Sequence, residues 1–140
     1  MSLEQVIHTL EARVYHLGKR LWRDDPVLQL HEEAEQVRLE LRFRYDELSR
    51  CRGAVTAARR RIAAKELKVV LLASSIETAT LARNASGAWQ QALELEQLRQ
   101  AIAADRAELP YLQRACRKHT QDIAQLEQRL SQLEKQLAPV

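Results

Sequence analysis

The chain has 140 residues, with 22 basic and 19 acidic residues, a net charge of +3, and only three glycines and three prolines. Its length favours a single domain, and its abundance of Ala, Leu, Glu, Gln and Arg is typical of long helices or coiled coils. No run of about 18 apolar residues is present, so no membrane-spanning helix and no membrane partner are expected. The N-terminus lacks a basic segment followed by an apolar one, and we therefore expect a cytoplasmic location.

A first helix is predicted over about residues 2–23. Ser2 is a suitable N-cap, and the sequence Asp24-Asp25-Pro26 ends this helix while Asp25 caps the next one. Apolar residues recur in steps of three and four along it, which predicts one apolar face. We expect this face to pack on the base of the helices that follow, against Leu28, Leu39 and Phe43. The apolar residues are Leu3, Ile7, Leu10, Val14, Leu17 and Leu21.

A second helix is predicted over about residues 26–84, because an apolar residue occurs at every seventh position from Val27 to Ile76. Within it, residues 37–45 alternate between apolar and charged side chains, a period of two that also suits a strand. The helix is the better interpretation, because the seven-residue ladder crosses this passage without a change of phase. No second alternating run exists with which a strand could pair.

A turn is predicted at Asn84-Ala85-Ser86-Gly87, and a third helix over about residues 88–137. Its own seven-residue ladder runs from Leu95 to Leu137, and Pro110 lies inside it. If the chain folds back about Gly87, facing residue numbers add to about 174. We therefore predict an all-α fold of three helices in one elongated domain, residues 1–140. It is a long antiparallel coiled-coil helical hairpin with the short N-terminal helix packed on its base.

Polar residues interrupt the two ladders at Arg44, Lys65, Asp105 and His119. Polar residues at such positions set the register and the choice of partner in coiled coils, so we assign these four to seam specificity. Lys65 falls one layer from Asp105. Cys51 and Cys116 also lie on the ladders, roughly 10 Å apart in the predicted register, and we expect both to be reduced, packed thiols.

No motif for catalysis or cofactor binding is present. The chain lacks HExxH, CxxC, GxGxxG and GxxxxGK[ST] sequences, and its four histidines do not share a metal-ligand spacing with Cys or acidic residues. We therefore expect no enzyme, no catalytic residue, no metal and no cofactor.

A basic stretch covers residues 38–68, where ten bases outnumber four acids and give a local charge of about +6. Such a surface can bind nucleic acid or another polyanion. The alternative is a solvated flank that complements acidic residues on another helix. The possible polyanion contacts are Arg59, Arg60, Arg61, Lys65 and Lys68.

Apolar residues near the predicted tip of the hairpin lie off the two seven-residue ladders, where a two-helix structure cannot cover them. An uncovered apolar patch usually marks an interface. We expect a second copy of the chain to cover it in a four-helix bundle, although the first helix or a bend is an alternative cover. The predicted function is a non-enzymatic coiled-coil scaffold or protein–protein interaction module that forms a homodimer and/or binds another helical protein. The predicted interface residues are Leu67, Val70, Leu71, Leu81, Trp89 and Leu93.

The plan of two long, basic, paired helices is similar to that of the stalk family of type III and flagellar export systems. The similarity covers the architecture and no individual motif, and the helix that ends at Asp24-Asp25-Pro26 departs from that plan. The resemblance implies a third functional alternative, a stalk or export-associated coiled-coil protein.

Overall fold

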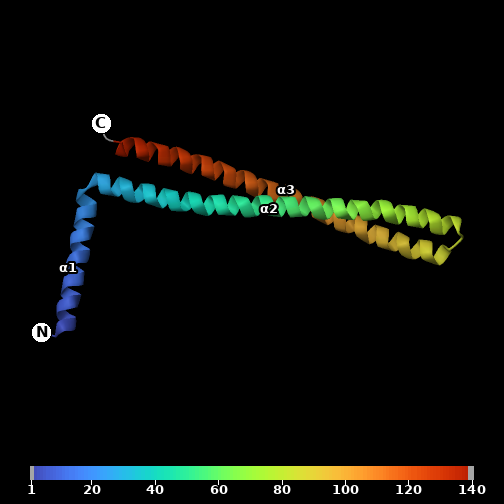
Figure 1. The fold of residues 1–140 in the computed structure, drawn as a ribbon, viewed down its shortest axis with the longest axis horizontal. Helices are drawn as coiled ribbons and strands as arrows, with labels where there is room; N and C mark the ends of the chain where they lie inside the picture. The colour runs from blue at the N-terminus through green and yellow to red at the C-terminus, as the bar shows by residue number, and fades with distance from the viewer. Residues whose placement is uncertain (1, 139–140) are drawn as a thin grey trace. The chain divides into compact units, whose positions relative to one another are not determined.

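The computed structural model describes residues 2–138, apart from the side chain of Trp22, and these residues form three α-helices and no strand. They are α1 (Leu3–Asp24), α2 (Pro26–Leu81) and α3 (Ala85–Leu137), shown in Figure 1. Residues 37–45 are helical, as expected. None of the helices contains, within the described residues, a stretch long and apolar enough to cross a membrane. Contacts divide the chain into two units, residues 45–121 and residues 1–44 with 122–140.

The starts of α1 and α2 follow from local side-chain caps. Ser2 accepts a hydrogen bond from the backbone N–H of Gln5 at 3.3 Å, and the Gln5 side chain accepts one from the Ser2 N–H at 3.4 Å, which completes a capping box. Asp25 Oδ1 accepts from the N–H groups of Val27 and Leu28 at 3.0 and 3.2 Å. The predicted caps at Ser2 and Asp25 are therefore confirmed.

Within residues 45–121, the segments of α2 and α3 run in opposite directions and pack extensively. Their contacts join residues progressively farther apart in sequence: Gln91 with Ser75, Asp105 with Lys65, and Leu112 with Cys51. Burial follows the predicted ladders, because apolar side chains spaced three and four apart face the other helix. The buried core residues of this unit are Leu48, Val55, Ala58, Ile62 and Ile102.

The connection between α2 and α3 lies about three residues earlier in the chain than predicted. Helix α2 ends at Leu81, Arg83 adopts a left-handed conformation with φ 58°, and α3 begins at Ala85. Asn84 is the N-cap of α3, because its Oδ1 accepts from the N–H of Gly87 at 3.1 Å. Gly87 therefore lies inside the first turn of α3, and the predicted reversal about it is wrong.

This earlier turn shifts the pairing of the helices by one heptad. The predicted register places Cys51 opposite Ile123, whereas Cys51 Sγ donates to the carbonyl oxygen of Leu112 at 3.3 Å and lies beside the Cys116 thiol. A seven-residue shift leaves every apolar ladder position opposite another one, so the ladders alone could not distinguish the two registers. The predicted separation of Cys51 and Cys116 by a heptad is wrong for the same reason.

The other unit contains α1, the start of α2 and the end of α3. Ala34 and Leu133 are fully buried between α2 and α3, and Val37 and Leu41 are nearly so. Ion pairs flank this core: Arg38 with Glu134 at 3.6 Å, and Arg129 with Glu33.

Helix α1 does not pack on the other helices as predicted. Each of its described side chains is exposed, including the whole apolar face from Leu3 to Leu21, and Leu28, Leu39 and Phe43 are exposed too. The physical reason is the connection to α2, in which Asp25 is the one non-helical residue. Antiparallel helices in contact need a loop of about 2–5 residues, so α1 cannot fold back along α2.

Candidate functional site

The six predicted interface residues are all exposed in the unit formed by residues 45–121. Leu67, Val70, Leu71 and Leu81 lie on the side of α2 away from its half-buried ladder positions, so they form one outer stripe. Trp89 and Leu93 lie on the outer side of α3. The structure thus provides two apolar surfaces on different helices, and one partner helix cannot cover both.

The predicted polyanion contacts fall into different environments. Arg60, Arg61 and Lys68 are exposed on α2. Lys65 lies on the ladder of α2, and its Nζ forms an ion pair with Asp105 Oδ2 at 2.5 Å. Its charge is therefore balanced within the chain. Arg59 lines a groove between α2 and α3.

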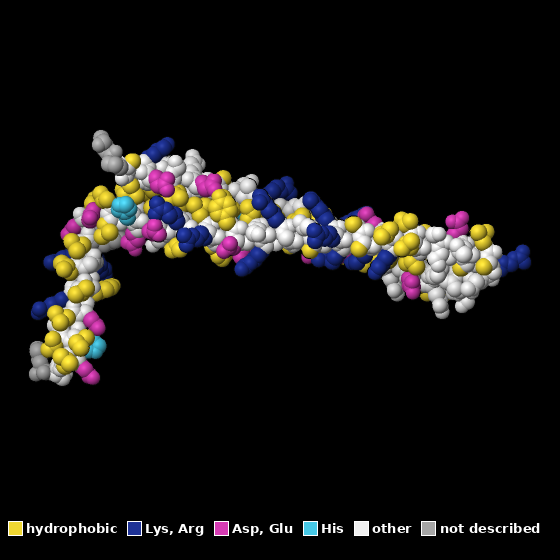
Figure 2. All heavy atoms as spheres, in the orientation of Figure 1, with side chains coloured by type: hydrophobic (Ala, Val, Ile, Leu, Met, Phe, Trp, Pro, Cys, Tyr) yellow, Lys and Arg dark blue, Asp and Glu magenta, His cyan; other side chains and the backbone are white. Residues whose placement is uncertain are grey.

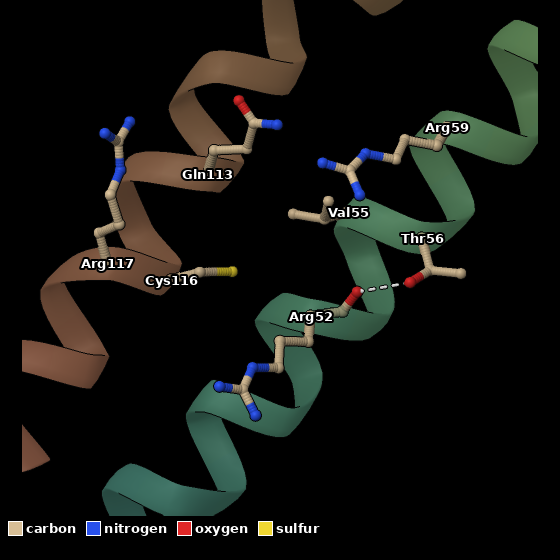
Figure 3. Close-up of a pocket in the computed structure, with 7 residues that line it drawn as sticks. All are labelled: Arg52, Val55, Thr56, Arg59, Gln113, Cys116 and Arg117. Carbon is tan, nitrogen blue, oxygen red and sulfur yellow. Dashed lines mark hydrogen bonds between the residues drawn. The ribbon is translucent and has the colours of Figure 1, made fainter.

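That groove has a volume of about 580 Å³ and combines arginines from both helices. Arg52 and Arg59 come from α2, and Arg117 comes from α3. Figure 3 shows Val55 and the sulfur of Cys116 directed toward each other between the helices, with the arginines around them. The Thr56 hydroxyl donates to the Arg52 carbonyl oxygen of the same helix at 3.0 Å.

The groove arginines have no acidic counterpart among the described residues, whereas several neighbouring bases do. Arg50 pairs with Glu47 at 3.0 Å, and Arg106 pairs with Glu66. Across residues 50–61 and 106–118 there are nine bases and one acid. Figure 2 shows Lys and Arg side chains along this part of α2 and α3. An unbalanced positive potential of this kind attracts anions.

Sequence reasoning missed Arg52 and Arg117 as groove residues. Arg52 lay within the basic stretch but outside the compact run Arg59–Arg61, and Arg117 is 65 positions away from Arg52. Only the register of α2 on α3 brings Arg117 to the same groove. A sequence signal was present in the second basic run, Arg114 to Lys118.

The four polar residues on the ladders differ in their ion-pair and hydrogen-bond partners. Arg44 pairs with Asp122 at 3.4 Å, and Lys65 pairs with Asp105. The side chains of this second pair are 28% and 15% exposed, so the ion pair is largely removed from water. His119 has a buried Nδ1 without a hydrogen-bond partner in the described structure. Both ion pairs join α2 to α3.

Cys51 and Cys116 face each other across the helix pair, and both are free thiols. Burial is the main cause that raises the pKa of Cys51 to about 11, with further contributions from the hydrogen bond and charge of Cys116 and from the charge of Glu47. At neutral pH Cys51 is therefore a thiol and a weak nucleophile.

No group of three or more His, Cys, Asp or Glu side chains within the described residues is arranged to hold a metal ion. The described residues also provide the exposed apolar side chains of α2 and α3 and the arginine-lined groove. Comparison with protein-family models, with curated protein sequences and with solved structures gives no match for this chain.

Proposed function

We propose that this chain is a non-enzymatic helical interaction module, built on an antiparallel coiled-coil hairpin of α2 and α3, that self-associates through the outer stripe of α2. The observation that carries the proposal is the stripe itself. Leu67, Val70, Leu71 and Leu81 are between 61% and 80% exposed over 15 residues of one helix. Burying a leucine of this kind stabilises a complex by about 1–2 kcal/mol.

A second copy is the partner that best fits this surface. The four apolar residues lie along one side of a single helix, and an identical stripe presents the same spacing to it in a two-fold symmetric pairing. Antiparallel contact of two α2 helices would then join two helix pairs into a four-helix dimer, with α2 against α2 at its centre and the α3 helices on its outer sides. Trp89 and Leu93 lie on the outer side of α3, away from that contact, where they would bind another helical protein.

Sedimentation velocity tests the proposal directly. The wild-type chain is expected to sediment as a dimer, and the Val70→Glu, Leu71→Arg variant as a monomer with unchanged helix content. The matched control is Leu39→Glu, Phe43→Arg, which places the same charges on another exposed apolar pair. A monomeric wild type, or a control that dissociates as fully as the α2 variant, would refute self-association through this stripe.

Polyanion binding is a second candidate function, and the unpaired arginines of the groove favour it. Each phosphate neutralised by an arginine releases counterions, so binding weakens steeply with salt. For a short duplex DNA, replacing Arg52, Arg59 and Arg117 with glutamine is expected to lower the salt slope by about 3.

The matched control replaces Arg60, Arg61 and Lys68 with glutamine, because these bases are exposed outside the groove. It is expected to change the salt slope less than the groove variant does. An equal loss in both variants would eliminate the groove as the site, and a lack of binding of wild type at low salt would eliminate polyanion binding.

A further inference from the structure

The facing thiols of Cys51 and Cys116 form a pair between α2 and α3, in the part of the unit of residues 45–121 that is far from the turn. Cys51 Sγ lies 3.3 Å from the carbonyl oxygen of Leu112. In the continuous helix α3, that carbonyl accepts the backbone N–H of Cys116, four residues later. The Cys51 sulfur is therefore one hydrogen bond away from the turn of α3 that carries Cys116.

The side chain of Cys116 completes this arrangement. Its sulfur is directed toward α2 (Figure 3), and the two thiols are hydrogen-bonding neighbours. Packed helices have axes about 8–10 Å apart, and Cα atoms lie about 2.3 Å from each axis. Facing Cα atoms are then about 3.4–5.4 Å apart, a range that overlaps the separation of about 4.4–6.8 Å found in disulfides.

We propose that Cys51 and Cys116 are an oxidative modification site, at which a low-molecular-weight disulfide carrying carboxylates converts them into an interhelical disulfide that clasps α2 to α3. The reaction begins at Cys116, because this residue lines the groove. Arg52, Arg59 and Arg117 attract the carboxylates of a reagent such as oxidised glutathione to the same groove.

The two steps balance as thiol–disulfide exchange. Cys116 loses its proton to solvent and attacks one sulfur of oxidised glutathione, which releases one glutathione thiolate and leaves a mixed disulfide. Cys51 then loses its proton and attacks the Cys116 sulfur, which forms the protein disulfide and releases a second glutathione thiolate. The protein loses two hydrogen atoms, and one molecule of oxidised glutathione is reduced to two thiols.

Intact mass measurement of the full chain tests the proposal. Reduced wild type is treated with oxidised glutathione at mildly alkaline pH and quenched with acid. The expected product has lost two hydrogen atoms, carries no glutathione, and migrates faster than the reduced chain on a denaturing gel without reductant. A product with two attached glutathiones, or one linked only between chains, would show that the thiols cannot meet and would overturn the proposal.

Serine variants keep the order of steps falsifiable, and circular dichroism checks their helix content. Cys51→Ser is expected to stop at a stable glutathione adduct of Cys116, and Cys116→Ser to react at least tenfold more slowly at Cys51. In wild type, the neutral reagent hydroxyethyl disulfide is expected to react several-fold more slowly than oxidised glutathione at low salt. A faster reaction of Cys116→Ser than of Cys51→Ser, or equal rates with the two reagents, would overturn entry through the arginine-lined groove.

Discussion

The ion pair between Lys65 and Asp105 allows a quantitative test of how α2 is held on α3. The two side chains meet at 2.5 Å within the seam, where the Asp105 side chain is 15% exposed and that of Lys65 is 28% exposed. We consider Lys65→Leu, Asp105→Leu and the double variant. The single changes each leave one charge behind, and the double change leaves an apolar layer.

The magnitudes follow from what each change leaves in the seam. Lys65→Leu leaves a mostly enclosed carboxylate without its cation, and the expected cost is about 2–3 kcal/mol, below the 3–5 kcal/mol of a fully buried pair. Asp105→Leu costs about 1 kcal/mol, because the lysine can extend its ammonium group toward water. The double variant is expected to be as stable as wild type or about 1–2 kcal/mol more stable.

Urea denaturation followed by far-ultraviolet circular dichroism measures the free energies of unfolding at one protein concentration. The expected interaction energy from the double-mutant cycle is then about 3–6 kcal/mol. In a thermal scan, Lys65→Leu should lower Tm by about 6–9 °C. The neighbouring pair Arg106–Glu66 is the matched control, because it joins the same helices with side chains that are 61% and 48% exposed. Its interaction energy should stay below about 1 kcal/mol.

Two results would refute this reasoning. An interaction energy for Lys65 and Asp105 no larger than that of the exposed control pair would mean that the seam does not enclose the charges. A double variant less stable than both single variants would mean that the ion pair stabilises the fold more than the apolar layer that replaces it.

Three further outcomes follow from the structure. Asn84→Ala removes the cap of α3 and should lower the free energy of unfolding by about 1 kcal/mol. Asn84→Asp should keep most of the stability that the cap provides, and an equal loss in both variants would contradict the capping role. The raised pKa of Cys51 means that its thiol holds the proton more tightly in the folded chain than in the unfolded one. Wild type should therefore lose stability relative to Cys51→Ser as pH rises from about 9 to about 11. Stability profiles of the two proteins that stay parallel over this pH range would contradict the expectation. Pro110→Ala restores a backbone donor inside α3 and should raise the free energy of unfolding by about 2 kcal/mol, a gain that equilibrium urea denaturation would detect or exclude.

The faces of α2 and α3 that pack together could be predicted from the sequence, because burial depends first on local periodicity. Val55, Ile62 and Ile102 are apolar residues on the ladders, and all three are buried. The caps at Ser2 and Asp25 were predictable for a similar reason, since a cap satisfies backbone donors only two or three residues away.

The register and the groove were beyond the sequence, because a heptad ladder looks the same after a shift of seven residues. Asn84 and Gly87 both signal a turn, and the choice between them moves α3 along α2 by a heptad. That choice brings Cys51 to Cys116 and Arg52 to Arg117.

The prediction for α1 went wrong for a different reason. Periodicity shows that a helix has an apolar face, but the face is buried only if the connection lets it reach a partner. The single non-helical residue at Asp25 is too short for that.

By itself, the sequence determined that the described chain is helical, where α1 and α2 begin, and which sides of α2 and α3 face each other, because these properties depend on residues within a few turns. Only the tertiary structure decided the register, the meeting of Cys51 with Cys116, the arginine-lined groove, and the exposure of α1. Each of these depends on where a three-residue turn or a one-residue connection places helices that are themselves compatible with more than one arrangement.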